Sequence, residues 1–141
     1  MAVPPRIGLV TLAVRDIERM ASLLRAFGWP EAPSSEPPHR VFQLTNGVAI
    51  ALYGAEHYEQ AFGPIAAGFR GFTLCVNLGS MAEVRAAHAA LAAIPDVELL
   101  EEPQEAEWGG GFSWRDPEGN VWDVAWADGS TLDERGGLTF P

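Results

Sequence analysis

The chain repeats one order of predicted elements, and this duplication constrains its fold more than any other feature. Each half reads as a strand, a helix and then two or three strands, of which the last two are joined by a tight turn. Val14 and Val76 hold equivalent places in the two halves, and so do Gly47 and Gly119. Because neither short half can bury a sheet face alone, we expect the halves to pair into one α+β fold.

The first half begins with a strand and a helix. Residues 7–14 combine apolar and small side chains in the manner of a strand. Asp16 then precedes an apolar stripe at helical spacing and is a suitable N-cap. Gly28 is a suitable residue to end this helix, because glycine accepts the left-handed conformation that often follows a last turn.

The remainder of the first half predicts a loop and a hairpin. Residues 30–39, which include His39, are rich in proline and serine and predict a loop. The pair Asn46-Gly47 is a strong signal for a tight turn between two strands. We expect those strands at residues 41–44 and 48–53.

The second half follows the same order. Residues 71–76 predict a strand, and Ser80 with Glu83 forms the capping-box pattern at the start of a helix. A short strand is expected at residues 97–100. Residues 101–107 and the glycines at 109–111 then predict a loop.

The stretch FSWRDPEGNVWDVAWA closes the second half with a hairpin. Its turn has aspartate first, proline second and glycine fourth, which are the preferences of a type I turn. Side chains on a strand alternate between its two faces, so Trp122 and Val124 share one face and Asp123 lies on the other. A single carboxylate placed within a strand makes Asp123 the first candidate for a functional group.

Composition narrows the class of protein. A chain of 141 residues with 48% hydrophobic residues is expected to form one domain with a real core. The formal net charge of −10, with nine Lys and Arg spread along the chain, argues against a nucleic-acid ligand. No apolar run is long enough for a membrane span, and the first residues lack the pattern of a signal peptide. With Cys75 as the single cysteine, we expect a cytoplasmic protein.

Four stretches together resemble the vicinal oxygen chelate superfamily, which includes glyoxalase I, extradiol dioxygenases, fosfomycin-resistance enzymes and bleomycin-binding proteins. They are LVTLAVRDIERMASLLRAFGW, GFRGFTLCVN, WGG and DPEGNVWDVAW. The resemblance implies two paired βαβββ modules that form one curved mixed sheet around a cleft, with helices outside. It places module one at about 6–53, a connector at 54–70, module two at about 71–127 and a tail at 128–141.

In metal-dependent members of this superfamily, His, Gln and Glu ligands lie on the first and last strands of each module. The resemblance places these ligand positions on Leu9, Ala51, Gly71 and Asp123. Three of the four residues offer no side-chain donor, and a catalytic metal normally needs about three protein ligands. No metal or other cofactor is therefore expected, with a divalent metal held through other ligands as the alternative.

The predicted cleft lining is mostly small and apolar, with a few polar groups, as in a small-molecule pocket. Asp123 is either a structural acid, bonded to Thr73, Tyr53 or water, or an acid-base group, and in either case it could anchor a basic ligand group. Cys75 is either a buried filler or a nucleophile, and Trp108 either covers the core edge or forms a lid. The candidate ligand-binding residues are Thr11, Tyr53, Thr73, Cys75, Trp108 and Asp123.

Three hypotheses for function remain open. The first is a protein that binds a small, partly aromatic molecule without a metal. The second is a glyoxalase-like lyase or isomerase in which Asp123 is the catalytic acid-base, with or without a divalent metal. The third is a structural cleft in a protein that acts through a protein partner. The resemblance also predicts a homodimer, since closed two-fold pairs are the usual oligomer.

Overall fold

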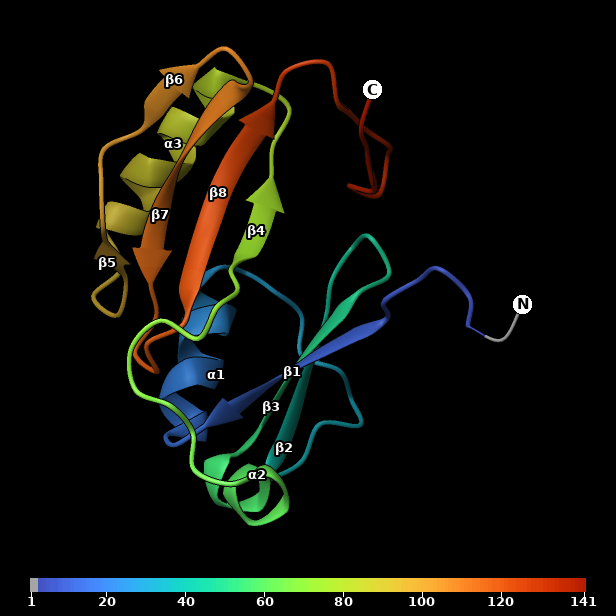
Figure 1. The fold of residues 1–141 in the computed structure, drawn as a ribbon, viewed down its shortest axis with the longest axis vertical. Helices are drawn as coiled ribbons and strands as arrows, with labels where there is room; N and C mark the ends of the chain where they lie inside the picture. Colours follow the sequence, from blue (N-terminus) through green and yellow to red (C-terminus); the bar gives the residue numbers. More distant parts are fainter. Residues whose placement is uncertain (1–2) are drawn as a thin grey trace. The chain divides into compact units, whose positions relative to one another are not determined.

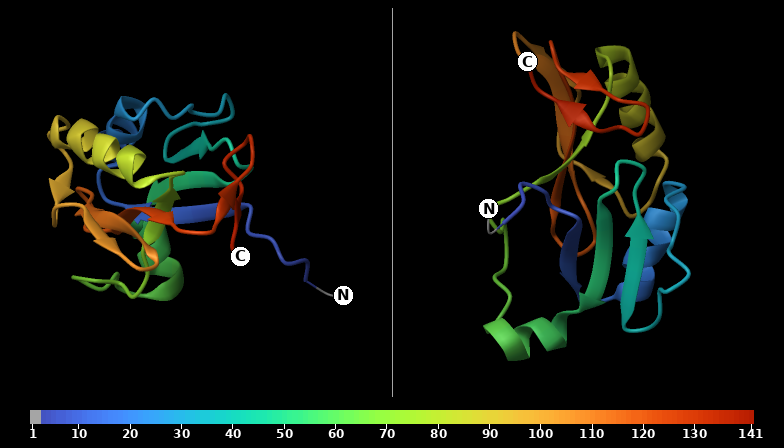
Figure 2. Two further views of the ribbon diagram at one scale, coloured as in Figure 1. Left: turned by 90° about the horizontal axis from the view of Figure 1, so that it is seen from above. Right: turned by 90° about the vertical axis from the view of Figure 1, so that its right-hand side faces the viewer.

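The computed structural model describes residues 3–141 (Figures 1 and 2). The chain divides into two compact units, whose bounds are Met1–Ile65 and Ala66–Pro141. The described residues carry three helices and three separate sheets, in agreement with the predicted α+β class. Each unit has its own hydrogen-bonded sheet, so the one curved sheet expected from the sequence is not formed by strand pairing between described residues. A shared cleft between the modules stays a prediction.

Unit one is built around a three-stranded mixed sheet in the order β1-β3-β2, where β1 and β3 are parallel. Its sheet carries α1 against one face, and Leu12, Leu24, Ile50 and Leu52 are buried in the core. The elements are β1 (Leu9–Val14), α1 (Ile17–Ala26), β2 (His39–Gln43), β3 (Ala49–Gly54) and α2 (Ala55–Phe62).

Local signals account for most of unit one. The side chain of Asp16 accepts a hydrogen bond from the backbone N–H of Arg19 at 3.1 Å, as expected of an N-cap. Gly28 has φ of 79° and follows the helix end, and Gly47 has φ of 89° in the β2–β3 turn. His39 is the first residue of β2 and pairs with Tyr53, so its assignment to the proline-rich loop was wrong. Helix α2 lies in the connector, to which the sequence assigned no element.

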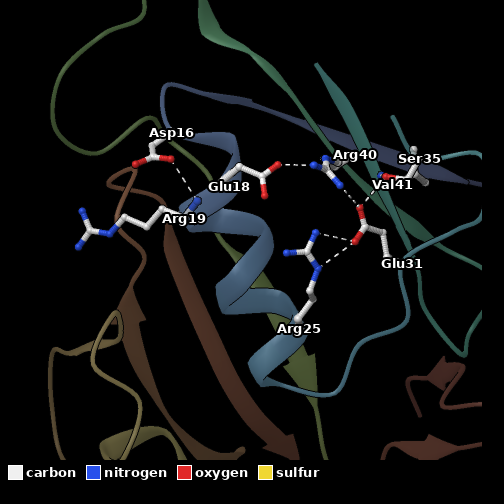
Figure 3. Close-up of polar contacts among 8 residues, drawn as sticks. All are labelled: Asp16, Glu18, Arg19, Arg25, Glu31, Ser35, Arg40 and Val41. Carbon is white, nitrogen blue, oxygen red and sulfur yellow. Dashed lines mark hydrogen bonds and ion pairs between the residues drawn. The ribbon is translucent and has the colours of Figure 1, made fainter. Parts of the chain in front are cut away.

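A partly exposed ion cluster connects the proline-rich loop to α1 and β2 (Figure 3). Glu31 accepts two hydrogen bonds from Arg25 on α1, at 3.0 and 2.8 Å, and one from Arg40 on β2 at 3.0 Å. Ser35 donates to the same carboxylate at 2.8 Å, and Arg40 also pairs with Glu18. Desolvation acts to raise the pKa of Glu31, but the hydrogen bonds from Ser35, Arg25 and Arg40 outweigh it and leave that pKa lowered.

Unit two contains a five-stranded mixed sheet in the order β4-β8-β7-β5, with β6 paired to β7, and α3 packs on one face of it (Figure 1). A small two-stranded sheet of β9 and β10 follows in the tail. The elements are β4 (Leu74–Asn77), α3 (Met81–Ala92), β5 (Glu98–Leu99), β6 (Gln104–Ala106), β7 (Gly109–Arg115), β8 (Val121–Ala127), β9 (Thr131–Leu132) and β10 (Leu138–Thr139).

The start of α3 carries the predicted capping interaction with one change. Ser80 accepts a hydrogen bond from the backbone N–H of Glu83 at 3.2 Å. The Glu83 carboxylate reaches back to the N–H of Gly79 at 2.8 Å, one residue earlier than in the standard capping box. The first contact satisfies a backbone donor of the first helical turn, and the second satisfies a donor just before the helix.

Three assignments in unit two differ from the sequence prediction. Part of the predicted loop at 101–107 forms strand β6, because Gln104–Ala106 pair with β7. The first strand begins at Leu74 rather than Gly71, because Gly71 has φ of 88° and cannot continue a strand. The glycines at 109–111 lie in β7 rather than in a loop. They pair with both β6 and β8, and their missing side chains allow these strands to approach closely.

Candidate functional site

The β7–β8 hairpin separates buried aromatic residues from a polar open face. Phe112, Trp114, Trp122 and Val124 are all buried on the side that packs against α3. Trp114 and Trp122 stack with ring centroids 5.3 Å apart and an interplanar angle of 14°. The predicted packing of Trp122 and Val124 is therefore confirmed, and Trp114, whose face the sequence left open, also belongs to the core.

Asp123 lies on the opposite face of β8 and is held by two hydroxyl groups. Thr73 donates to one carboxylate oxygen at 2.6 Å, and Ser113 donates to the other at 2.6 Å. Ser113 is the residue directly opposite Asp123 in the β7–β8 register. These two bonds fix the plane of the carboxylate and partly compensate for the loss of water around it.

A pocket of about 360 Å³ opens beside this carboxylate, entirely within unit two. Trp108 is the large aromatic residue of its wall and is 57% exposed. Small residues leave the space that a ligand would fill. The lining consists of Cys75, Glu101, Gln104, Ala106, Trp108, Gly111, Phe112, Ser113, Asp123, Val124 and Ala125.

Cys75 pairs with Asp123 in the parallel β4–β8 ladder and faces the same pocket. The residue as a whole is exposed, yet desolvation of the thiol, with the neighbouring charge of Asp123, raises the pKa of Cys75 to about 11. At neutral pH this thiol is almost wholly protonated. Because the thiolate is the nucleophilic form, the pocket is poorly suited to cysteine-based catalysis.

We expect Cys75 of the native protein to be alkylated by iodoacetamide roughly 100-fold more slowly at pH 8 than in the denatured chain, where a thiol has a pKa of about 8.5. The rate should keep rising up to about pH 10.5. Asp123→Asn should increase the rate at pH 8, because it removes a negative charge that opposes thiolate formation. The reaction can be followed by mass spectrometry, and a rate that levels off below pH 9 would contradict the assignment.

The two candidates of unit one, Thr11 and Tyr53, lie on its sheet. Thr11 on β1 pairs with Ala51 on β3. Tyr53 is half-buried in a group of aromatic rings, edge-on to His39 at 5.4 Å and to Tyr58 at 5.7 Å. His57 on α2 lies 4.9 Å from the same ring. Tyr53 is therefore already packed by its own unit, and its role in ligand binding stays a prediction.

The residues at the family's metal positions offer few side-chain donors, and the metal-free state of the protein stays a prediction. Leu9, Ala51 and Gly71 supply no donor atom, and the fourth, Asp123, is bonded to hydroxyl groups. Throughout residues 3–141, no group of three or more His, Cys, Asp or Glu side chains is placed to hold an ion. His88 on α3 packs edge-on against Phe112, with ring centroids 4.9 Å apart, on the buried side of the sheet.

Sequence reasoning missed some residues of the pocket. Ser113 could have been found by counting back from the turn, because the hairpin register places it opposite Asp123. Glu101 and Gln104 had no such signal, since they line the pocket only because β6 pairs along β7. Of the predicted ligand-binding residues, Cys75, Trp108 and Asp123 line the pocket, while Thr73 supports Asp123 through its hydroxyl group.

Comparison with known proteins agrees with the α+β fold. The model of the Glyoxalase/Bleomycin resistance protein/Dioxygenase superfamily matches residues 6–124. The chain therefore belongs to this superfamily. A comparison with curated proteins gave no match. Throughout the described chain, no helix has the length and apolar character needed to cross a membrane.

Solved structures show the same fold at low sequence identity. A glyoxalase-related enzyme from Fulvimarina pelagi has a TM-score of 0.84 and 22% identity, covering 97% of this chain and 99% of its own. A lactoylglutathione lyase from Agrobacterium tumefaciens has a TM-score of 0.70 and 17% identity, with coverage of 87% and 94%. The fosfomycin resistance protein FosX from Mesorhizobium loti has a TM-score of 0.67 and 18% identity, with coverage of 94% and 98%. At these identities the likeness concerns the fold alone.

Proposed function

We propose that this protein binds a small, partly aromatic molecule in the pocket of unit two without the help of a metal. The observation that carries the proposal is one cavity of about 360 Å³ with an aromatic wall, Trp108, beside an immobilised carboxylate, Asp123. Small-molecule sites commonly combine such an apolar surface with a few fixed polar groups. The ring of the ligand would pack on Trp108, and a donor group of the ligand would reach Asp123.

The arrangement around Asp123 favours binding over acid-base catalysis. Both of its oxygens already accept hydrogen bonds from hydroxyl groups, which hold the carboxylate in place as an acceptor in the pocket wall. The neighbouring Cys75 thiol is a poor nucleophile at neutral pH. The alternative of a glyoxalase-like lyase or isomerase, named by analogy with the superfamily, would use Asp123 as its acid-base group.

The proposal predicts that small aromatic compounds bind and that binding depends on Trp108. We expect Trp108→Ala to weaken the affinity for a neutral probe, indole-3-ethanol, about tenfold or more, because the stacking surface is lost. Binding can be measured by titration with NMR detection of the pocket amides. Phe140→Ala is the matched control, since Phe140 is 67% exposed in the same unit and does not line the pocket. Equal affinity of wild type and Trp108→Ala would contradict the proposal.

A native mass spectrum of the untreated protein tests the metal-independent part of the proposal. An apo protein, or one that retains an organic molecule, agrees with it. One divalent ion per chain, removed by chelator together with a measurable activity, would overturn it and favour the enzyme alternative.

A homodimer is part of the same proposal. Nine large hydrophobic side chains are exposed among residues 3–141, including Phe62, Phe69 and Phe72, and pairing of subunits would cover part of such a surface. We expect a solution mass of twice the chain mass of 15.2 kDa at micromolar concentration, measured by light scattering after size exclusion. A monomeric mass under these conditions would contradict the prediction.

A further inference from the structure

The charge of the pocket points to a particular class of ligand. Two ionisable carboxyl groups line it, Asp123 on β8 and Glu101 before β6. Within the part of the chain that the structure describes, no Lys, Arg or His side chain is among the lining residues. The pocket therefore combines two negative charges with no positive charge of its own.

Neither carboxylate is neutralised from another direction. The partners of Asp123 are the hydroxyl groups of Thr73 and Ser113, which position the carboxylate and leave its charge in place. Among residues 3–141, no ion pair joins Asp123 or Glu101 to a cationic side chain. Each Asp123 oxygen accepts one hydrogen bond from the protein and has capacity for another donor. A half-buried carboxylate of this kind gains most from a cationic donor.

The negative charge of Asp123 also acts on the adjacent thiol of Cys75. The negative charge of Asp123 helps to raise the pKa of Cys75, second only to desolvation. A negative potential thus extends across the wall from β8 to β4 and would oppose the entry of an anionic ligand. The formal net charge of −10 acts in the same direction.

Trp108 supplies a second attraction for the same kind of ligand. Its ring lines the pocket together with the two carboxylates and remains 57% exposed. The face of an indole ring attracts cations and also stacks on other aromatic rings. The wall can therefore hold either part of a molecule that joins an aromatic ring to an amine.

We propose that the pocket of unit two selects small aromatic molecules that carry a protonated amine, with the ammonium group on Asp123 and the ring on Trp108. This inference rests on the proposed binding function and adds the charge of the ligand to it. Glu101 contributes a weaker, longer-range attraction, because it is exposed at the pocket wall.

A matched series of indole probes tests the charge preference. Each probe has an indole ring and a two-carbon chain that ends in ammonium (tryptamine), hydroxyl (indole-3-ethanol) or carboxylate (indole-3-propionate). We expect tryptamine to bind about tenfold more tightly than the hydroxyl probe at low salt and the carboxylate probe to bind most weakly. The affinities come from NMR titrations in which the pocket amides report the site.

Variants of the two acidic residues test which carboxylate causes the preference for tryptamine. Asp123→Asn should reduce the advantage of tryptamine over indole-3-ethanol to less than about twofold, and Glu101→Gln should reduce it by a smaller factor. Glu134→Gln is the matched control, because it removes one negative charge at an exposed position of the same unit outside the pocket. It should leave the preference unchanged. If Asp123→Asn does not fold, wild-type titrations at 0.5 M salt serve instead, since screening should lower the advantage of tryptamine selectively.

The outcomes distinguish the preference for a cationic ligand from the proposed binding function on which it rests. Equal affinities for the three probes at the pocket, or tightest binding of the carboxylate probe, would overturn the charge preference and leave the binding function intact. A preference for tryptamine that survives Asp123→Asn and high salt would also overturn it. Failure of all three probes to shift the pocket amides would contradict both proposals.

Discussion

Replacing Asp116 with alanine is expected to lower the free energy of unfolding by about 3–5 kcal/mol, the largest effect of any polar substitution in unit two. Its carboxylate is 4% exposed at the start of the β7–β8 turn. It accepts hydrogen bonds from the backbone N–H groups of Glu118 and Asn120, at 2.8 and 3.0 Å. It also accepts bonds from the Asn120 amide at 3.0 Å and the Trp122 indole at 2.9 Å. Alanine would leave these buried donors without an acceptor.

Chemical denaturation followed by tryptophan fluorescence measures this loss. Asp116→Asn should fall between wild type and alanine, because one acceptor oxygen remains while its amide faces the donors of Asn120 and Trp122. Asp128→Ala is the matched control, since Asp128 is an exposed aspartate in the next turn. That control should stay within about 0.5 kcal/mol of wild type. An equally small effect at Asp116 would show that the turn is held by its backbone conformation alone.

The second large effect is expected at Gly109, where alanine should cost at least about 3 kcal/mol of folding free energy. Gly109 has φ of 140°, a conformation that side chains rarely adopt. An added Cβ would lie 1.9 Å from the carbonyl oxygen of Trp126, which belongs to the backbone of β8 and cannot rotate away. The strands would have to separate at the end of the sheet that carries Trp108.

The matched control for this substitution is Gly8→Ala. Gly8 has no atom within 4 Å of an added Cβ and does not have the strained φ of Gly109. Its replacement should leave the thermal midpoint almost unchanged, whereas Gly109→Ala should lower it by roughly 10 °C or more for a domain of this size. Similar midpoints for the two variants would contradict the close approach of β7 and β8.

The parts of the fold that could be predicted are those that depend on residues close together in the sequence. The turns at Asn46-Gly47 and Asp116–Gly119 and the caps at Asp16 and Ser80 depend on neighbouring residues, and the structure has all of them. The position of the glycines at 109–111 within β7 depends instead on contacts with β6 and β8, which are remote or weakly marked in sequence. Glycine composition alone favours a loop, so tertiary pairing overrode the local signal.

The candidate site also contains residues that the sequence predicted and residues that it did not. Alternation along the strand placed Asp123 on the open face, and the Thr73 hydroxyl group does bond to it, as one hypothesis stated. Trp108 and Cys75 share a pocket with Asp123, although the sequence could not say how closely. Glu101 enters the pocket only through the path of the chain between β5 and β7. Its part in the charge of the site could not be derived from periodicity, because a loop has no fixed period.

Side chains along β7 and β8 alternate between the buried face and the open face of the sheet. This alternation has a consequence for how the protein can evolve. Phe112, Trp114, Trp122 and Val124 are buried on the side that packs against α3, while Ser113, Asp123 and Ala125 alternate with them and line the pocket. If the proposed function holds, substitutions at Ser113, Asp123 or Ala125 would alter ligand binding at little cost to the core, whereas substitutions at the neighbouring buried positions would destabilise the core. A saturation library along β8 should show tolerance that rises and falls with a period of two. A lineage built on this hairpin can acquire new ligands while its stability stays under separate selection.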